Sequence, residues 1–563
     1  MEGRLVITHA DSIAHARLVV RDQPVTGTWV FDPTLYERAV DAGLPAVEVI
    51  APKPVTDHRT LLGCARQQAF ALEAELDRLL QSVAPGPSLL GWQHVNLNYQ
   101  ITATRWYAEL WDGQLGLFAG SLPHLFLSDN PAHYYWPSFG PALQLAHRLR
   151  GAGIDFKAYT YGGRPDLSPM VPALFDAPDD GPQPTLLTHL PTTFYDKGYF
   201  LDEVRASGHR AMNLQSRIWN VDFPMDADVP VATVDQALAL LDPADLDRID
   251  TFHALAAQHL ETWLAAPIPS PEHRRRQARH IADGYRSQLV TLRLLERRFA
   301  RQRPARVLIS DHDAGFHGPI LSFAKAHAIP VVMVPHSKFT PEFEFPGDQI
   351  TCLTHPLQAD TLSDAHGRRV RQYRLAYPET FRGASAPSGE LRTVGLLLNG
   401  LSLNGVQFTG FEAYIAGVRR IAGWCRDQGL ALKLRGRPGD PMTTAMAEAT
   451  GLSRQTLAEG LSESLADFAA SVDICLMYDA PTSADLEFLR NGVALLNPVP
   501  EPLYCAEAMQ ANASVVPRDD VEATLHRLGD LASDPVRLTE FRRQQFIAYV
   551  GLFASAQPLR HFL

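Results

Sequence analysis

The residues best suited to chemistry lie in one short segment, residues 308–338, which has the sequence LISDHDAGFHGPILSFAKAHAIPVVMVPHSK. Its Asp311-His312-Asp313 triplet follows an apolar run, as polar residues do at the end of a buried strand. A carboxylate there can act as a general base toward a hydroxyl or as a nucleophile toward an electrophilic carbon. Asp-x-Asp can also bind a divalent cation, and Asp311 can order a turn or cap the next helix. These alternatives stay open.

A histidine and a lysine follow the next apolar run of the same segment. They are His336 and Lys338, and in a parallel sheet they would lie beside the aspartates. His336 could pair with a carboxylate or protonate a leaving phosphate, and Lys338 could bind an acidic substrate group. A lone histidine at a strand end is commonly structural, and a zinc site among these histidines lacks tight ligand spacing. Asp311, Asp313 and His336 are therefore our candidate catalytic residues.

A second informative segment is DICLMYDAPTSADLEFLRNGVALLNPV, residues 473–499. Thr482 and Ser483 stand where a helix should follow a buried strand, and their hydroxyls with the free N–H groups of a helix start suit a phosphate. Glu487, about one turn later, can accept hydrogen bonds from a ribose diol. The same residues also fit an ordinary helix cap. The segment therefore predicts a nucleotide site or a plain capping motif.

Two further loops are expected at the same edge of that sheet. The first, ALKLRGRPGD at residues 431–440, carries Arg435 and Arg437, whose guanidinium groups can neutralise phosphate. The second, LLLNGLSLNG at residues 396–405, is rich in Gly and Asn and includes Asn404, which suits close backbone approach to a phosphate. The P-loop pattern GxxxxGK[ST] is absent.

Several loop segments of the N-terminal half combine aromatic rings with amide and imidazole groups, the groups that commonly contact sugar rings. Their candidate residues are His94, Asn96, Tyr134 and His189. Large aromatic residues can equally serve to pack loops onto a domain. The sequence thus indicates either an acceptor-binding surface or packed insertions.

The elements that must position these residues follow the rhythm of a parallel α/β sheet. Short β-branched runs recur, each followed by Gly, Pro, Asp or His and usually by a helical stretch. A second series starts near residue 391, after the linker-like RGASAPSGE. We predict two Rossmann-like, doubly wound domains, residues 1–381 and 391–540. Residues 541–563 should form a C-terminal helix that packs back on the N-terminal domain, and ligands should bind where the strands' carboxyl ends meet.

A helix-rich insertion is expected at about residues 200–303. Within it, residues 271–303 should form one long helix, because apolar residues return every three or four positions. They are Ile281, Tyr285, Leu289, Leu292 and Phe299. Eleven arginines lie between residues 274 and 306. They fit the solvated face of a connecting helix, or a surface attracted to anionic lipid or an acidic glycan.

Composition limits the function classes. The 563-residue chain is 46% hydrophobic, which predicts several globular cores, and its net charge of −11 argues against a general nucleic-acid binder. The five cysteines lack metal or disulfide spacing, and no signal peptide or run of about 18 apolar residues is present. We therefore expect a cytoplasmic protein, able to work at the inner face of the inner membrane.

Three stretches together carry a resemblance to a known family. They are AKAHAIPVVMVPHSK (324–338), LKLRGRPGD (432–440) and YDAPTSADLEFLRNGVALLNP (478–498). They resemble the two-domain glycosyltransferases of the GT-B fold, and more narrowly the bacterial capsule and O-antigen transferases similar to Kdo and sialic-acid transferases that use CMP-sugars. The resemblance covers the C-terminal half. The family's basic-Pro loop often has His-Pro, whereas this chain has Arg437-Pro438.

The resemblance implies a nucleotide-sugar donor on the C-terminal domain and a glycan or lipid-linked glycan acceptor on the N-terminal one. The donor residues it implies, with those suggested by the loops, are Asn404, Arg435, Arg437, Thr482, Ser483, Glu487 and Lys338. It further implies transfer of Kdo or a related acidic sugar to a bacterial surface polysaccharide or lipopolysaccharide, without metal or other cofactor. The alternatives are a nucleotide-sugar epimerase or hydrolase of the same fold and a non-catalytic component of glycan assembly.

Overall fold

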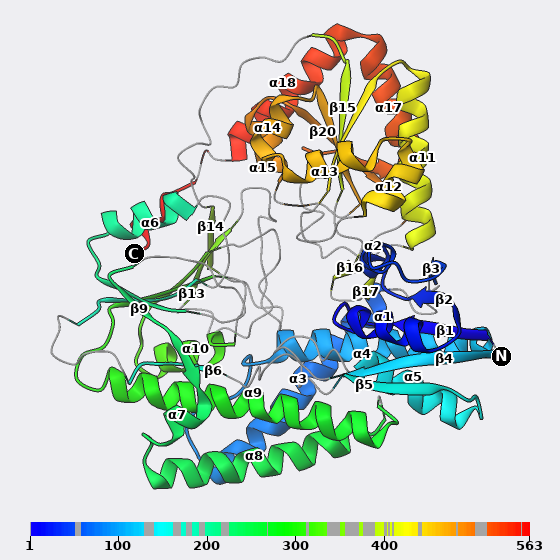
Figure 1. Cartoon of the computed structure of the whole chain (residues 1–563). Helices are drawn as coiled ribbons and strands as arrows, with labels where there is room; N and C mark the ends of the chain where they lie inside the picture. Colours follow the sequence, from blue (N-terminus) through cyan, green and yellow to red (C-terminus); the bar gives the residue numbers. More distant parts are fainter. Residues whose placement is uncertain are drawn as a thin grey trace.

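The described elements form three parallel sheets, two of which are joined by a layer of long helices (Figure 1). The computed structural model describes residues 2–50, 58–128, 140–161, 170–175, 183–190, 197–215, 225–266, 268–310, 315–334, 350–354, 371–374, 389–398, 402–403, 406–407, 410–436, 442–479, 482, 484–501, 515–552, 554 and 556–563. Within a few of the helices and strands it describes the backbone alone.

The first sheet has five parallel strands in the order β3-β2-β1-β4-β5. Its elements are β1 (Glu2–Ile7), α1 (Ser12–Asp22), β2 (Val25–Val30), η1 (Pro33–Leu35), α2 (Tyr36–Asp41), β3 (Val47–Val49), β4 (Ser121–Ser128), α5 (Gly140–Gly151) and β5 (Lys157–Tyr161). The chain extends the sheet on one side of β1 and then on the other, so the strand order reverses between β1 and β4. That switch point is where ligands bind in doubly wound sheets.

The central sheet has seven parallel strands in the order β14-β13-β12-β11-β7-β8-β9. Its elements are β7 (Leu186–His189), α6 (Lys197–Ala206), β8 (Ala211–Leu214), β9 (Ala227–Val229), β11 (Arg306–Ser310), α10 (His317–Ala326), β12 (Val331–Val334), β13 (Ile350–Thr354) and β14 (Arg371–Arg374), with the small antiparallel pair β6 (Met170–Pro172) and β10 (Val231–Thr233) and helix α7 (Val234–Leu238) beside it. Its switch point lies between β7 and β11.

The C-terminal sheet has five parallel strands in the order β18-β15-β19-β20-β21. Its elements are β15 (Thr393–Leu398), the hairpin β16 (Ser402–Leu403) and β17 (Val406–Gln407), α11 (Phe411–Asp427), β18 (Ala431–Arg435), α12 (Thr443–Thr450), α13 (Arg454–Ser462), α14 (Leu465–Ala470), β19 (Ile474–Tyr478), α15 (Asp485–Arg490), β20 (Ala494–Val499), β21 (Arg518–Asp520) and α17 (Val521–Ser533). Its switch point lies between β15 and β19.

Four long helices connect the first and central sheets. They are α3 (His58–Val83), α4 (His94–Gln114), which the short η2 (Leu115–Phe118) extends, α8 (Pro243–Trp263) and α9 (Pro271–Arg298). The predicted apolar stripe of α9 is confirmed, since all five stripe residues are at most 5% exposed. Several arginines of this helix bind groups of the protein itself: Arg286 contacts Asp250 at 2.6 Å and Arg293 contacts Asp245 at 3.4 Å. These contacts favour the connecting-helix interpretation.

The end of the chain crosses from the C-terminal sheet to the central one. Helix α18 (Pro535–Leu552) covers the C-terminal sheet, where Gln545 exchanges hydrogen bonds with the backbone of Leu495. Residues 556–563, with the turn η4 (Leu559–His561), then contact α6. The amide of Leu559 donates to the Tyr199 hydroxyl at 3.0 Å, and that of Arg560 donates to Glu203 at 2.9 Å. The tail therefore joins two sheets.

The predicted α/β class with doubly wound parallel sheets is confirmed. Two details differ from the expectation. Residues 1–381 contain two parallel sheets, because within the described ranges the first five strands pair only with one another. The region expected as a helical insertion, about 200–303, also contributes β8 and β9 to the central sheet. Both differences arise because strand partners are non-local, and a repeated strand-helix pattern does not say which strands pair.

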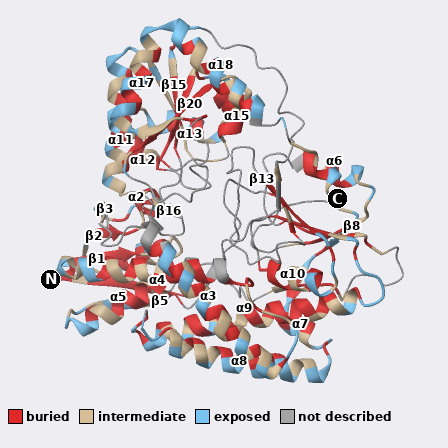
Figure 2. Ribbon diagram, turned by 180° about the vertical axis from the view of Figure 1, so that it is seen from behind, coloured by how far each residue is buried: buried red, intermediate tan, exposed pale blue. Residues whose placement is uncertain are grey.

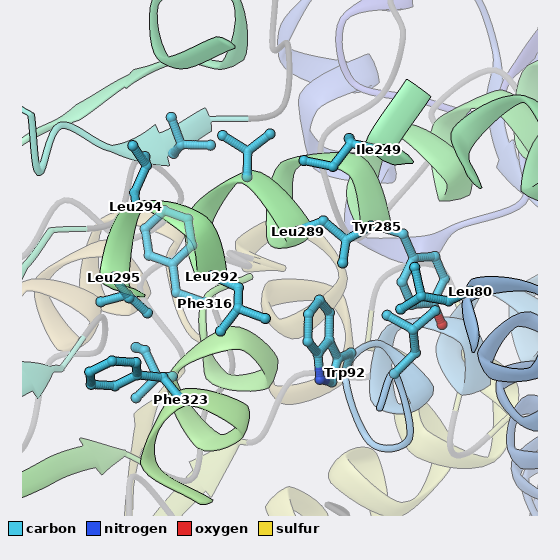
Figure 3. Close-up of a cluster of buried hydrophobic side chains, with 14 of the residues drawn as sticks. Leu80, Trp92, Ile249, Tyr285, Leu289, Leu292, Leu294, Leu295, Phe316 and Phe323 are labelled. Carbon is cyan, nitrogen blue, oxygen red and sulfur yellow. The ribbon is translucent and has the colours of Figure 1, made fainter. Parts of the chain in front are cut away.

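Buried residues concentrate in the three sheets and in the helix faces turned toward them (Figure 2). The largest cluster packs α3, α4, α8, α9 and α10 on one face of the central sheet. Figure 3 shows Trp92 and Tyr285 projecting into it from different elements. Trp92 sits so close to α10 that a side-chain carbon added at Gly318 would lie 2.6 Å from its Cγ. Gly318 therefore permits this close packing.

Candidate functional site

Most of the predicted site residues lie outside the described part of the chain. These are Asp311, Asp313, His336, Lys338, Asn404, Arg437, Ser483 and Tyr134, and for His94 and Asn96 only the backbone is described. The elements beside them are described. These neighbouring elements locate the two ends of each segment that carries a predicted residue.

The segments that carry the candidate catalytic residues start from one edge of the central sheet. Strand β11 ends at Ser310, directly before the triplet, and β12 ends at Val334, two residues before His336. Ser310 and Val334 are register partners in this parallel pair. Strand β7, on the other side of β11, ends at His189. Ser310, the residue before the triplet, therefore ends its strand at the switch point of the sheet, the expected place for a ligand.

His189 lies beneath this edge rather than on its surface. It is 0% exposed, and its Nδ1 lies 2.8 Å from the carbonyl oxygen of Leu214, so Nδ1 carries the proton and donates. Its ring lies 5.1 Å from that of Phe316 and 5.5 Å from that of His317. A buried side chain does not reach an acceptor, so the expected direct contact is corrected to a supporting position beside Phe316 and His317.

His317 begins α10 and is also fully buried. Burial lowers the pKa of His317 to about 3, because the charged imidazolium would lose its hydration. The ring is therefore neutral at neutral pH. Neutral His317 therefore adds no buried positive charge beside the switch point of the central sheet.

His317 should make stability depend on pH. The unfolded chain binds a proton near pH 6.5 and the folded chain near pH 3, so stability is lost as the pH falls through that window. The loss is up to about 1.4 kcal/mol per pH unit. His317→Gln removes this contribution. When the pH falls from about 6.5 to about 5, the free energy of unfolding measured in urea should therefore drop by up to about 2 kcal/mol less in the variant than in the parent. Equal losses in the variant and the parent would contradict the assignment.

A buried carboxylate fixes the start of α4 against α3 and α9. Glu73, which is 0% exposed, accepts hydrogen bonds from the amides of Gly91 at 2.8 Å and Gln93 at 2.5 Å. The Tyr285 hydroxyl of α9 donates to the same carboxylate at 2.9 Å. Such charge-assisted bonds in a buried site are strong and directional. Glu73 therefore holds three segments in one arrangement.

A glutamine on α9 connects this arrangement to the turn after the triplet. The Gln288 amide donates to the carbonyl oxygens of Trp92, at 3.3 Å, and Gly315, at 3.1 Å. The Trp92 indole donates to Ser322 of α10 at 2.8 Å. The first turn of α4, which carries His94, thus lies beside the residues that follow Asp313. No local pattern in the sequence indicates Glu73 or Gln288, because their hydrogen-bond partners are distant in the chain.

The C-terminal sheet places its predicted donor residues differently from the expected cap. Thr482 accepts a hydrogen bond from the amide of Ala484 at 3.1 Å and orders the turn, whereas Ala484 itself is the N-cap of α15. Glu487 bonds through Oε1 to Arg490 at 2.5 Å and Asn491 at 3.0 Å. Arg435 donates from Nε to the carbonyl oxygen of Glu463 at 3.2 Å. These contacts belong to the fold of the domain.

A further carboxylate, Asp479, stands at the switch point of the C-terminal sheet. It directly follows β19, is 0% exposed and has a φ of 68°, a left-handed conformation that is uncommon for residues other than glycine. Its amide donates to Pro498 at 3.0 Å, and Asn497 donates to its carbonyl oxygen at 2.9 Å. Strained backbone of this kind clusters at functional sites. Its position after an apolar strand was the available sequence signal.

The carboxyl edges of the first and C-terminal sheets meet through Glu37. This residue of α2 is 4% exposed and accepts from the Thr444 amide at 2.8 Å, from the Thr443 hydroxyl and from Arg454 at 2.8 Å. Helix α2 follows the carboxyl end of β2, and α12, whose first turn holds both threonines, follows that of β18. Strand β17, after β15, contacts α4. Carboxyl-edge segments of the first and C-terminal sheets therefore lie against each other, and the hairpin that follows β15 reaches α4.

Two kinds of feature are absent from the described residues. Among the ranges that the structure places, no three His, Cys, Asp or Glu side chains gather as metal ligands do. Within the same ranges, no helix is long and apolar enough to cross a membrane.

Comparison with known proteins finds only weak structural similarity. No family model and no curated protein matches the chain. Among solved structures, it is similar to CalG4, the calicheamicin glycosyltransferase, at 13% identity and a TM-score of 0.37, covering 66% of this chain and 95% of that one. MurG of Acinetobacter baumannii has 11% identity and a TM-score of 0.36, covering 67% and 96%. A UDP-N-acetylglucosamine 2-epimerase has 14% identity and a TM-score of 0.33, covering 66% and 95%. Similarities of this size establish no activity.

Proposed function

We propose that the protein is a glycosyltransferase that moves a sugar from a nucleotide donor to a glycan acceptor. The observation that carries the proposal is the contact between carboxyl-edge segments of two doubly wound sheets, the first and the C-terminal, through Glu37 at α12. Ligands of such sheets bind at these edges. Two facing edges can hold a donor and an acceptor together and exclude water from the reacting atoms.

The aspartates after β11 are the proposed reacting groups. Asp311 or Asp313 would take the proton of the acceptor hydroxyl or attack the anomeric carbon, and His336 would assist the leaving phosphate. His94, Asn96 and Tyr134 would bind the acceptor, with His189 supporting the edge from below. The residues themselves supply the acid-base chemistry, so we expect no metal requirement.

The donor is proposed to lie at the switch point of the C-terminal sheet. Thr482 and Ser483 would approach its phosphate, with Asn404, Arg437 and Lys338 nearby. Glu487 would approach the ribose, and Arg435 would add positive charge, although both also make the contacts given above. Asp479 fixes the start of this loop through its backbone bonds. The residues of the donor site therefore combine hydroxyl, amide and cationic groups.

The narrower proposal is a CMP-activated acidic sugar such as Kdo, transferred to a bacterial surface polysaccharide or lipopolysaccharide. The motif resemblance at residues 324–338, 432–440 and 478–498 supports it. Work on such an acceptor would place the protein at the inner face of the membrane. Exposed arginines of α9, such as Arg275 and Arg279, would face an anionic surface.

The test is a thermal-shift screen of CMP-, UDP- and GDP-sugars, followed by product analysis of the best ligand. A donor present at a hundred times its Kd should stabilise the folded chain by about 2.7 kcal/mol. Transfer should then require an added glycan and survive chelation by EDTA. Conversion of the donor without any glycan would instead indicate an epimerase or hydrolase. Absence of both a shift and turnover would favour a non-catalytic component.

A further inference from the structure

The first sheet has a switch point of its own, which the catalytic and donor sites proposed above do not use. The polar residues gathered there form what we term the first-sheet cluster. It consists of His9, Asp11, Ser128, Tyr161 and Arg276. The first two follow β1, the next two end β4 and β5, and Arg276 comes from α9. The cluster therefore lies where a doubly wound sheet binds ligands.

The floor of the cluster is buried and fixed. Ser128 and Tyr161 are register partners, 2% and 3% exposed, and their side chains share a hydrogen bond. Burial and the nearby Asp11 carboxylate raise the pKa of Tyr161 to about 12, while the Ser128 hydrogen bond opposes this. The His15 ring packs on Tyr161 at 5.0 Å. This floor is rigid and uncharged at neutral pH.

Three side chains of the cluster remain accessible. The side chains of His9, Asp11 and Arg276 are 36%, 35% and 33% exposed. His9 accepts the Asp11 amide at its Nδ1, at 3.2 Å, so in the neutral ring Nε2 carries the proton. Arg276 donates to the Ser128 carbonyl at 3.0 Å and to Glu272 at 2.8 Å, which orients its guanidinium group. The surface of the cluster thus presents the guanidinium group of Arg276, the Nε2–H donor of His9 and the carboxylate of Asp11.

This combination suits a ligand that carries both an anionic group and hydroxyls. The guanidinium fork matches a carboxylate or phosphate, and a carboxylate such as that of Asp11 accepts hydroxyl hydrogens. An acidic saccharide unit supplies both kinds of group.

The long helix α9 relates this cluster to the proposed reaction centre. Arg276 touches the first sheet near one end of the helix, and Gln288 contacts Gly315 beside the triplet. Twelve helical residues separate them, about 18 Å along the axis. The two switch points are therefore held at a fixed spacing by one rigid element.

We propose that the first-sheet cluster is a second saccharide subsite, which binds an acidic unit of the acceptor glycan about 18 Å along α9 from Gln288, the residue that contacts Gly315. The inference rests on the proposed function, because it gives that acceptor its chemical class. A chain with this subsite would select acidic glycans that extend beyond the sugar being modified.

The test measures binding of acidic octasaccharides to the full chain by calorimetry, without donor or turnover. The panel contains uronate-, sialate- and Kdo-bearing glycans, each paired with its carboxyl-reduced form, and phosphorylated glycans that distinguish phosphate from carboxylate. At least one acidic member should bind more tightly than its neutral counterpart. Arg276→Gln should weaken that binding about 10- to 100-fold, the usual effect of losing a charge-assisted bond.

Arg205→Gln is the matched control, with the same charge change at an exposed position of α6, and it should leave the affinity unchanged. His9→Asn, which keeps an acceptor for the Asp11 amide, provides a second variant should Arg276→Gln fold poorly, and it should also weaken binding. Equal binding of acidic and reduced glycans, or equal loss in both arginine variants, would overturn the proposal. Binding through Arg276 in a chain that transfers no sugar would refute the proposed function and keep the subsite.

Discussion

Glu73→Ala should be the most destabilising of the substitutions considered for this protein. It leaves the amides of Gly91 and Gln93 and the Tyr285 hydroxyl without their buried acceptor. Removing one partner of such a buried charged network typically costs about 3 to 5 kcal/mol. Hydrogen exchange measured by mass spectrometry should show the segment around residue 92 opening far more readily, with a lower thermal midpoint.

Glu73→Gln refines this prediction. The glutamine amide keeps the size of the side chain but places an N–H group opposite one of the three donors, so the expected loss is about 1 to 3 kcal/mol. Glu75→Gln, two residues away on α3, is the matched control. Glu75 is 35% exposed and pairs with His259 at 2.8 Å, and such pairs contribute about 0 to 1 kcal/mol. Equal effects at positions 73 and 75 would show that the buried network does not fix the start of α4.

Asp311→Asn and Asp313→Asn should have the largest effect on activity. If one carboxylate is the base or nucleophile, its loss should lower kcat about 10²- to 10⁴-fold, as expected for a group that transfers a proton in the transition state. The other variant should change kcat far less. Rates measured with the best donor of the thermal-shift screen provide the test.

Binding separates a chemical role from a structural one in these variants. The donor-induced thermal shift should persist in both, because the proposed donor site lies on the C-terminal sheet. Asp283→Asn is the control. Asp283 lies on α9, well before the triplet in the sequence, and pairs with His253. A covalent glycosyl adduct, visible by mass spectrometry, would identify a nucleophile. Full activity in both variants would remove the triplet from the mechanism.

Much of the local structure could be predicted because its signals are local. The three- or four-residue spacing of apolar residues located α9, and strand-ending polar residues located the edges that carry Asp311 and Thr482. The helix predicted after this turn is present as α15, but its N-cap is Ala484, and the Thr482 hydroxyl orders the turn instead of capping the helix. Patterns of this kind depend only on neighbouring residues.

The tertiary contacts of the site could not be predicted in the same way. Glu73 meets Tyr285 across 212 residues, and Glu37 meets Thr444 across 407. A single glutamate in an amphipathic helix does not reveal such partners. The division of residues 1–381 into two parallel sheets was not predicted either, because strand partners are also distant in the chain. Strands such as β1 and β7 have similar composition but different neighbours.

The tail described above has a mechanical consequence. The C-terminal sheet is connected to the rest of the chain twice, once after β14 and again through residues 556–563, which are anchored on α6 at Tyr199 and Glu203. A domain that is attached by a single segment can rotate in any direction. A domain that is attached by two segments rotates most easily about the line that joins them. The domain should therefore rotate mainly about the line that joins the two connections, within the limits set by the Glu37 contacts with Thr444 and Arg454, and cutting the tail would permit rotation in further directions.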